Sequence, residues 1–327
     1  FGLLRGSGGP RIRTERLALA FGNHFFSPNI IYSSSAGLVP LGSLEHLRSA
    51  GFRGPVIHNQ NGLYFPAWFK GECAKKNAEL ANFSALSDYV IFQSDFCRRA
   101  FLELIPQGKL PSHEVLLNPS PDLSGGNIPV WNGPPQLLVA GNLGQGGAHV
   151  LLPALRMFAR AGKRLGASLL VLGNPPSDLM ENTEIRQALG ELEAAGINER
   201  LRFAPYDLAS FRSLLHGRPI SLHLRYKDAC PNAVPEKLSL GIPHIFSRSG
   251  GTPELVGKAG MGIPVEESWD RLISVSAVAL ENAVDSVLAR YEELSNQARL
   301  EFTTRLTFES YVRRHEEIFR RALEKSL

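Results

Sequence analysis

The chain has 327 residues, of which 43% are hydrophobic and 20% charged, enough for about two packed domains of ordinary size. With 35 Lys and Arg against 31 Asp and Glu, its net charge of +4 is too small to predict a nucleic-acid-binding protein. The 31 glycines and 22 prolines exclude a collagen-like or low-complexity chain, and no apolar run approaches the roughly 18 residues that would predict a membrane span.

The three cysteines, Cys73, Cys97 and Cys230, are an odd number and include no Cys-x-x-Cys pair. They predict neither a disulfide framework nor a structural zinc site, and they fit a reducing compartment. The chain begins at Phe1 and no signal-peptide pattern follows, so we expect the numbering to begin after a trimmed leader. The expected location is cytoplasmic, with the inner membrane face as an alternative place of peripheral contact.

Short runs rich in Val, Ile and Leu are separated by amphipathic stretches of helix length along most of the chain. Four to six apolar residues without polar alternation are typical of strands buried on both faces, as in parallel sheets that helices cover. In chain order the expected strands are Asn29–Ser34, Pro55–His58, Tyr89–Gln93, Glu114–Leu117, Gln136–Ala140, Ser168–Leu172, Leu201–Ala204, Ile220–Leu224 and Pro243–Ser247.

Alternation of strands and helices predicts a doubly wound α/β architecture. The stretch Pro119–Pro135 holds five prolines and little charge, which predicts a linker between domains. We therefore expect two Rossmann-like doubly wound domains facing a cleft, with bounds 1–122 and 136–305, a linker at 123–135 and a final helix at 306–327. The clearest helical patterns are Arg11–Ala20, Leu151–Arg164, Glu184–Ala195, Leu208–His216 and Glu301–Leu327.

The glycine-rich loop before the first expected helix is a candidate ligand contact on the acceptor side. Gly8 and Gly9 lie in this loop, where glycines let the backbone approach a ligand and a helix N-terminus favours negative charge. A plain turn into a helix is the alternative. The surrounding arginines form either a solvated face or a contact for an anionic acceptor or lipid headgroups: Arg5, Arg11, Arg13 and Arg16.

Polar groups follow the second expected strand. His58, Asn59 and Asn61 are followed by Tyr64. Amide and imidazole groups beside an aromatic ring suit a sugar, because hydroxyls need hydrogen-bond partners and the ring offers a stacking face. We therefore take these four residues as acceptor-side candidates; an ordinary loop with one histidine is the alternative.

A second glycine-rich turn, Gly141–Gly147, lies between the fifth expected strand and a helix. Such a turn suits a phosphate. It is not the dinucleotide fingerprint, because no acidic residue closes the next strand at the right distance, and it lacks the lysine of a Walker loop.

The most informative stretch runs from Asp228 to Glu254. Asp228 follows a strand and Glu236, eight residues later, opens or lies within a helix, so both carboxylates can face one crevice. A carboxylate accepts two ribose hydroxyls without a metal. Gly250 and Gly251 offer backbone N–H groups to phosphate or sugar oxygens, and Glu254 can accept hydrogen bonds from hydroxyls.

These residues resemble the signature of the GT-B-fold retaining glycosyltransferases of family four, the group 1 glycosyl transferases. The family's acidic-x7-Glu pattern is matched by Asp228-x7-Glu236, and its Gly-Gly-x-x-Glu turn by residues 250–254. Residues 118–122 are similar to the Asn-x-x-Asp turn that ends the acceptor domain of that family, and the last helix resembles the one that crosses back to the N-terminal domain. The resemblance extends over nearly the whole chain.

The resemblance implies transfer of a sugar from a nucleotide-diphosphate sugar to an acceptor hydroxyl, with retention and without a metal or other cofactor. The acceptor would be a carbohydrate, a lipid-linked group or a small molecule, and not a nucleic acid. Three residues would be catalytic. Glu236 would hold the ribose, Asp228 would lie near the donor sugar or the nucleophile, and His58 would contact the donor sugar from the acceptor side. The other donor-binding residues would be Gly141, Asn142, Arg225, Lys227, Asn232, Gly250, Gly251, Thr252 and Glu254.

The sequence departs from that family at three positions. Asp228 replaces a more usual glutamate, and the arginine and lysine of the donor-side glycine-rich loop fall on Asn142 and Gly146. Because charge stabilisation is often the largest catalytic contribution, losing two cations beside a leaving diphosphate is expected to raise the barrier by several kcal/mol unless other cations replace them. The candidate replacements are Arg225, Lys227, Lys237 and Arg248.

Two other functions remain open at this point. Asn142 and Gly146 favour a degenerate sugar-nucleotide-binding homologue or a non-catalytic partner subunit. Another enzyme with two Rossmann-like domains, such as a sugar-nucleotide epimerase, fits the same strand pattern. An assay of transfer separates the first alternative from a transferase, and the identity of the product separates the second.

Overall fold

The computed structural model describes residues 9–22, 29–35, 40–105, 110–141, 143–144, 146–173 and 177–325. The chain divides into two compact units. The first consists of Phe1–Phe65, Phe69–Pro119 and Phe308–Leu327, and the second of Pro66–Trp68 and Ser120–Thr307. None of the described helices is both long and apolar enough to cross a membrane.

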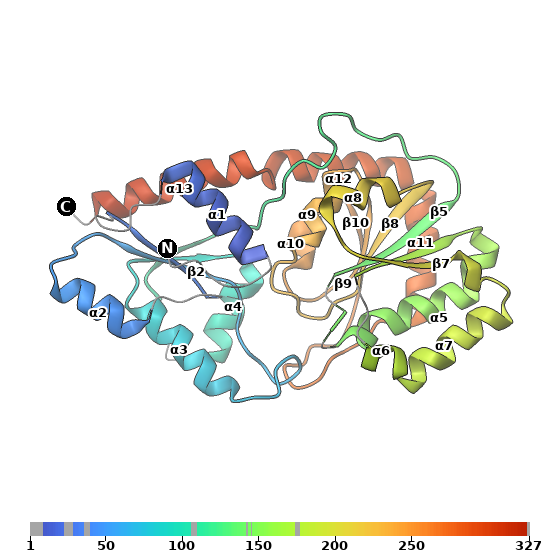
Figure 1. Cartoon of the computed structure of the whole chain (residues 1–327), viewed down its shortest axis with the longest axis horizontal. Coiled ribbons are helices and arrows are strands. Elements are labelled where there is room, and N and C mark those ends of the chain that lie inside the picture. Colours follow the sequence, from blue (N-terminus) through green and yellow to red (C-terminus); the bar gives the residue numbers. More distant parts are fainter. Residues whose placement is uncertain are drawn as a thin grey trace. The chain divides into compact units, whose positions relative to one another are not determined.

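The first unit is a parallel sheet in the order β1-β2-β3-β4 (Figure 1). Because consecutive strands are neighbours, right-handed crossovers place the connecting helices on one face. Val56 packs there with Leu44 and Phe83, whereas Ile57 and Ile91 on the opposite face pack with Ile318 of the C-terminal helix. The elements are α1 Gly9–Phe21, β1 Ile31–Ser34, α2 Leu41–Ser49, β2 Val56–Gln60, α3 Cys73–Ala85, β3 Tyr89–Phe92, α4 Asp95–Leu104, β4 Ser112–Val115 and α13 Phe308–Glu324.

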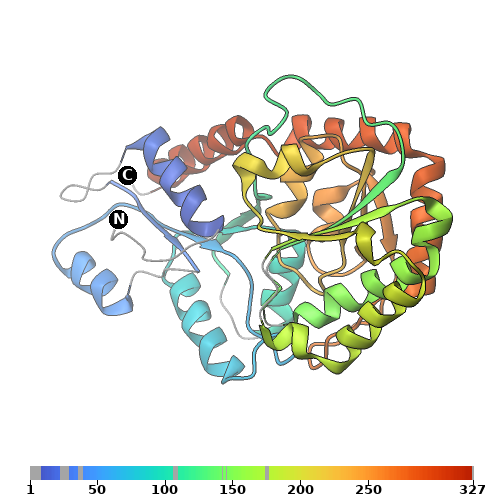
Figure 2. The ribbon, with the colours of Figure 1, turned by 45° about the vertical axis from the view of Figure 1, so that its right-hand side comes forward.

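The second unit is a six-stranded parallel sheet in the order β10-β9-β8-β5-β6-β7, with helices on both faces (Figure 2). The chain starts in the middle at β5, runs outward through β6 and β7, and then returns to β8 on the other side. This is the doubly wound arrangement, and its switch point lies between β5 and β8. The strands are β5 Pro135–Ala140, β6 Ser168–Leu172, β7 Leu201–Ala204, β8 Arg218–His223, β9 His244–Ser247 and β10 Gly260–Ile263.

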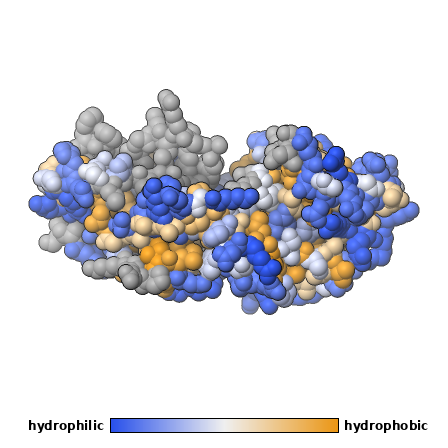
Figure 3. Space-filling view, turned by 90° about the horizontal axis from the view of Figure 1, so that it is seen from below, coloured by the Kyte–Doolittle hydropathy of each residue, from blue (hydrophilic) through white to orange (hydrophobic). Residues whose placement is uncertain are grey.

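The helices of the second unit cover two separate apolar cores. Leu137 and Val139 face a core built with α5, α7 and α11, while the intervening Leu138 faces a smaller one with Leu240 and Phe211. On the face drawn in Figure 3, hydrophilic surface alternates with smaller apolar areas. The helices are α5 Gly147–Leu165, α6 Ser177–Glu181, α7 Thr183–Ala194, α8 Leu208–Phe211, α9 Ala233–Leu238, α10 Thr252–Val256, α11 Ala277–Ala289 and α12 Tyr291–Arg305, with short 3-10 turns at Asn198–Arg200 and Arg212–Leu214.

The predicted fold class, α/β with Rossmann-like parallel sheets, is confirmed, and each expected strand lies within three residues of an observed one. Three element predictions were wrong in detail. β10 was missed, because two of its four residues are glycines. The expected helix Leu208–His216 is a short helix followed by a 3-10 turn. The terminal helical stretch is interrupted at Leu306 and Thr307, where Ser120 forms a bridge with Thr307.

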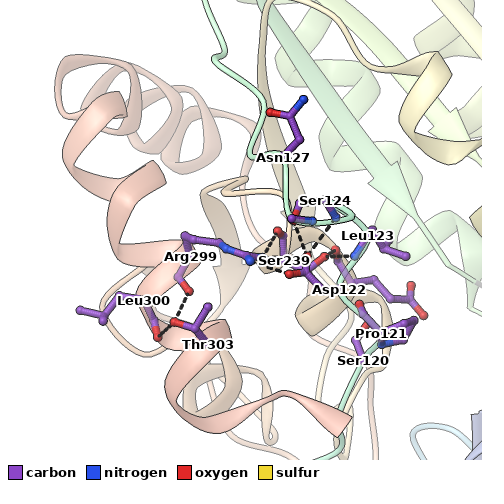
Figure 4. A network of polar contacts seen from close by, with 12 residues as sticks. Ser120, Pro121, Asp122, Leu123, Ser124, Asn127, Ser239, Arg299, Leu300 and Thr303 are labelled. Carbon is purple, nitrogen blue, oxygen red and sulfur yellow. Dashed lines mark hydrogen bonds and ion pairs between the residues drawn. The ribbon is translucent and has the colours of Figure 1, made fainter. Parts of the chain in front are cut away.

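The proline-rich stretch expected as a linker clusters with the second unit from Ser120 onward. Asp122 accepts hydrogen bonds from Arg299 at 2.8 and 2.5 Å, and this pairing lowers the pKa of Asp122 to about 2 (Figure 4). Leu123 N donates to Ser239 Oγ at 3.1 Å, and Trp131 Nε1 donates to the Leu240 carbonyl at 2.9 Å. These contacts attach the stretch to α12 and to the turn that follows α9.

Candidate donor site

A cavity of about 210 Å³ opens at the switch point between β5 and β8. In doubly wound sheets, ligands bind beyond the carboxyl ends of the strands at this point, where the two neighbouring loops diverge. The cavity is therefore the primary candidate site of the second unit. Its lining residues come from the ends of β5 and β8, from α5 and from the start of α9: Ala140, Gly141, Leu143, Val150, Leu222, His223, Leu224, Arg225, Asp228, Pro231, Asn232 and Ala233.

Four residues predicted from the sequence to serve the donor line this cavity: Gly141, Arg225, Asp228 and Asn232. Gly141 directly follows β5 with a φ of 138°, a backbone conformation that side chains disfavour, and a Cβ there would meet no atom within 4 Å. The open space beside its backbone is thus accessible to a ligand. Asn142 lies outside the described residues, as does Gly8, while Gly9 is the first residue of α1.

The carboxylate of Asp228 faces two potential cations. His223 Nε2 lies 3.5 Å and Arg225 Nε 3.6 Å from Asp228 Oδ2. Both distances are long for hydrogen bonds, and within the described residues the buried Nε2 of His223 has no hydrogen-bond partner. The cavity therefore presents an acceptor carboxylate next to a guanidinium and a ring nitrogen that can still bond to a ligand. Sequence reasoning missed His223; its position as the last residue of β8 was the available signal.

Among the four candidate replacement cations, Arg225 is the one that lines the cavity. Its guanidinium carbon lies 4.0 Å from the ring centroid of Trp68, a residue that sequence reasoning did not select. Lys227 is buried, donates to Glu267 and lies 3.8 Å from the centroid of Trp269. Lys237 is also buried, and Arg248 is exposed on the surface.

Glu236 lies on α9 with only 9% of its surface exposed, just beyond the residues that line the cavity. It follows Asn232 by four residues, so the two side chains share one face of the helix. The Tyr206 hydroxyl donates to Glu236 Oε2, and no described residue donates to Oε1. Glu236 thus keeps one carboxylate oxygen that can accept a hydrogen bond from a ligand.

Burial and neighbouring groups set the protonation of the Glu236 carboxyl group. Burial raises the pKa of Glu236, while Lys237 and the hydrogen bond from Tyr206 act in the opposite direction. Burial lowers the pKa of Lys237 to about 8, so its ammonium is still mostly protonated at neutral pH, where it donates to the Ala233 carbonyl at 2.9 Å. The pKa of Tyr206 is raised by burial, which keeps its hydroxyl a donor. Lys237 therefore supports the charge of Glu236 rather than facing a diphosphate.

The Gly250-Gly251 turn packs directly against the backbone of Asp228. Gly251 N donates to the Asp228 carbonyl at 2.8 Å, and Gly250 has a φ of 69°. The two halves of the sequence signature thus meet in space. Thr252, at the start of α10, is fully buried, and its hydroxyl has no partner among the described residues. Glu254 lies in the first turn of the same short helix.

We expect Gly250→Ala to lower the free energy of unfolding by about 2–4 kcal/mol, as the sum of left-handed strain and a steric clash. A Cβ at this position would overlap the Asp228 carbonyl oxygen and lie 2.7 Å from Asp228 N. Urea unfolding measures the change. Gly125→Ala is the matched control, because Gly125 has a φ of 60° but a Cβ at that position would meet no atom within 4 Å. Equal losses in both variants would show that the turn does not depend on contact with Asp228.

The acceptor-side candidates lie in the first unit, at the carboxyl end of β2. His58 is fully buried; Nδ1 pairs with Ser84 Oγ at 2.9 Å and Nε2 with Ser35 Oγ at 3.0 Å. Burial lowers the pKa of His58 to about 3, so the ring is neutral at physiological pH. His58 can therefore take part only through neutral hydrogen bonds, and its role toward a sugar stays a prediction.

Amide groups continue this polar cluster along the ends of β2 and β3. Asn59 Nδ2 donates to the Tyr32 hydroxyl at 2.7 Å, and Gln93 Nε2 donates both to Asn59 Oδ1 at 2.7 Å and to Asn61 Oδ1. Tyr64 is 36% exposed, with its ring centroid 4.9 Å from that of Phe69. Asn59 is thus held by the protein, whereas the partly exposed Tyr64 ring is accessible to a ligand.

Comparison with known proteins supports the sequence signature. Residues 134–282 match the family model described as glycosyl transferases group 1, a stretch that lies wholly within the second unit. No curated protein sequence matches the chain. This match covers slightly less than half of the chain and shows that the stretch is similar to the group 1 glycosyl transferases.

Solved structures show the same GT-B fold across the chain. Sucrose-phosphate synthase from Thermosynechococcus elongatus has a TM-score of 0.65 at 15% identity, covering 97% of this chain and 78% of its own. A glycosyltransferase from Rickettsia africae has a TM-score of 0.69 at 13% identity, covering 99% and 84%. Anabaena HepE in complex with UDP has a TM-score of 0.64 at 14% identity, covering 95% and 82%. At these identities the similarity establishes the fold alone.

Proposed function

We propose that this protein transfers a sugar from a nucleoside-diphosphate sugar to an acceptor hydroxyl, with retention at the anomeric carbon and without a metal. The observation that carries the proposal is the cavity at the switch point of the family-matched unit, which is lined by Arg225 and Asp228 and reaches the start of α9, the helix that carries Glu236. A cation suits the diphosphate, and the two carboxylates suit the hydroxyls of the donor sugar and of the ribose. The solved HepE complex with UDP, in the same fold, supports this class of ligand.

In this proposal each residue has one task. Glu236 Oε1 accepts a ribose hydroxyl, while Oε2 is oriented by Tyr206. Arg225 neutralises charge on the diphosphate, and Asp228 lies beside the donor sugar. The Gly251 N–H already donates to the Asp228 carbonyl, whereas the buried Thr252 hydroxyl has no partner among the described residues and can bond to a phosphate or sugar oxygen. Gly141 provides close backbone access, and Asn232 lies on the same wall.

We also propose a class of acceptor and a location for the protein. A carbohydrate, lipid-linked or small-molecule acceptor is consistent with the amide-rich cluster around Asn59 and the exposed ring of Tyr64. We propose that the protein is cytoplasmic, with peripheral contact to a membrane as the alternative. Lys227 is given no contact with the donor, because it is paired with Glu267. Glu254, in the first turn of α10, stays a predicted acceptor of hydrogen bonds from donor hydroxyls.

A thermal-shift panel of UDP, GDP, ADP and TDP tests the donor class. A nucleoside diphosphate at a hundred times its dissociation constant stabilises the folded state by about 2.7 kcal/mol, which gives a clear rise in Tm. We expect one base to give this rise and the corresponding nucleoside to give a smaller one. Absence of a response to all four diphosphates would contradict the proposal.

A second candidate function is a binding protein of the same fold that has lost catalysis. It is favoured by Gly146, which stands where the family places a cation and whose neighbour Trp68 leaves no room for a side chain. Such a protein would respond in the thermal-shift panel. It would release no nucleoside diphosphate from a donor sugar, either in the presence or in the absence of acceptors, and a coupled assay of that release separates the two functions.

A further inference from the structure

The segment Pro66–Trp68 follows β2 of the first unit in sequence but belongs to the second unit. Ala67 N donates to the Trp269 carbonyl at 2.9 Å, and Trp68 Nε1 donates to the Tyr226 carbonyl at 2.7 Å. Trp68 is thereby bound to the loop that directly follows β8. That loop also carries Arg225 and Asp228 into the cavity.

The Trp68 ring occupies the space in which a side chain at position 146 would begin. A Cβ built on Gly146 would lie 2.5 Å from Trp68 Cζ3 and 3.3 Å from Leu272 Cδ1. Gly146 also has a φ of 76°, which disfavours any other residue. A side chain at position 146 and the observed position of Trp68 are therefore mutually exclusive.

The same ring supports the guanidinium of Arg225. The guanidinium carbon lies 4.0 Å from the centroid of the Trp68 ring, close enough for a cation–π interaction. Stacking uses the flat face of a guanidinium, whereas its N–H groups donate in the plane, so a stacked arginine can still bind a phosphate through two parallel hydrogen bonds. The arginine also loses less rotational freedom on binding, because its side chain is already oriented.

We propose that Trp68 and Arg225 together form the diphosphate-binding cation of this chain, in place of the side chains missing from the glycine-rich turn. Arg225 contacts the diphosphate, and Trp68 is a positioning residue that holds the guanidinium at the cavity. The inference rests on the proposed function, since it assigns the part of the donor that Arg225 recognises. It also explains why position 146 is glycine.

The test compares the affinities of a nucleoside and its diphosphate, measured by titration calorimetry on the full chain. The Kd of the nucleoside divided by the Kd of the diphosphate isolates the contribution of the phosphates to binding. We expect Arg225→Ala and Trp68→Ala each to reduce this ratio by about tenfold or more, with the nucleoside affinity unchanged. Because the two residues act as one unit, the double variant is expected to lose little beyond either single change.

Two further variants keep the test decisive. Trp68→Phe retains an aromatic face and is expected to keep most of the ratio, which guards against a Trp68→Ala variant that fails to fold. Arg218→Ala is the matched control: Arg218 lies at the opposite end of β8, 5.9 Å from the centroid of Tyr291, and its loss should leave the ratio unchanged. A purely structural role of Trp68 would change nucleoside and diphosphate affinities alike.

The possible outcomes distinguish a failure of the role of Trp68 from a failure of the proposed function. An unchanged ratio in Trp68→Ala, or fully additive losses in the double variant, would overturn the role of Trp68 while leaving a nucleotide-binding site in place. If the unaltered protein binds neither nucleoside nor diphosphate, the proposed function fails and the role of the Trp68–Arg225 pair fails with it.

Discussion

Glu236→Ala is expected to weaken binding of the preferred nucleoside diphosphate by about ten- to a hundredfold. A hydrogen bond to a charged group contributes about 1.5–3 kcal/mol, and the variant removes the carboxylate acceptor and also frees the Tyr206 hydroxyl that it orients. The same loss should appear for the nucleoside alone, since the ribose is common to both. Calorimetric titration of the two ligands measures it directly.

The variant must be separated from a folding defect, because Glu236 is buried next to the buried ammonium of Lys237. Removing one partner of such a pair leaves an uncompensated charge and costs stability. Glu236→Gln keeps the shape and one acceptor oxygen, so it should fold with a smaller change in Tm and still bind weakly. A Glu236→Ala protein that folds and binds with unaltered affinity would place the ribose elsewhere.

Arg225→Ala is expected to lower kcat by about 10²–10³-fold, the range found when a donor that stabilises developing charge is removed. Negative charge accumulates on the diphosphate as the bond to the sugar breaks, and Arg225 is the candidate cation that lines the cavity. Arg225→Lys keeps the charge but loses the planar pair of donors and the stacking on Trp68, so it should recover only part of the rate.

Steady-state kinetics with the preferred donor measure this loss. Arg202→Ala is a suitable control, because Arg202 is an exposed arginine of β7 in the same sheet, and its removal should leave kcat unaltered. If Arg225→Ala retains full turnover, the diphosphate is neutralised by another group, and the account of the missing family cations is wrong.

Strands buried on two faces, such as β5, were predictable because their sequences are short continuous apolar runs such as Leu137–Val139. Elements with little side-chain volume or an interrupted pattern were not predictable. β10 contains Gly260 and Gly262, and a Cβ on Gly260 would overlap the backbone of β9. Its glycines are therefore required by close strand packing, which no local pattern reveals.

The site was predictable where its residues belong to one continuous motif. Asp228, Glu236 and Gly250 lie within a short stretch of sequence, and the hydrogen bond from Gly251 to the Asp228 carbonyl shows them packed together. Trp68 and Tyr206 were not found, because they reach this motif from positions 158 and 30 residues away from their hydrogen-bond partners.

Burial explains why two of the candidate replacement cations do not line the cavity. Lys227 and Lys237 resemble free cations in the sequence, but each is enclosed by aromatic rings and already bonded within the protein. Whether a charged side chain faces a cavity or an interior partner depends on tertiary packing, which spacing along one chain does not contain.

The most direct measurement is a crystal structure of the protein soaked with the nucleoside diphosphate that gives the largest thermal shift. The account predicts a ribose hydroxyl within hydrogen-bond distance of Glu236 Oε1, and phosphate oxygens beside the Arg225 guanidinium at the ends of β5 and β8. A nucleoside bound away from the Glu236 carboxylate would contradict it.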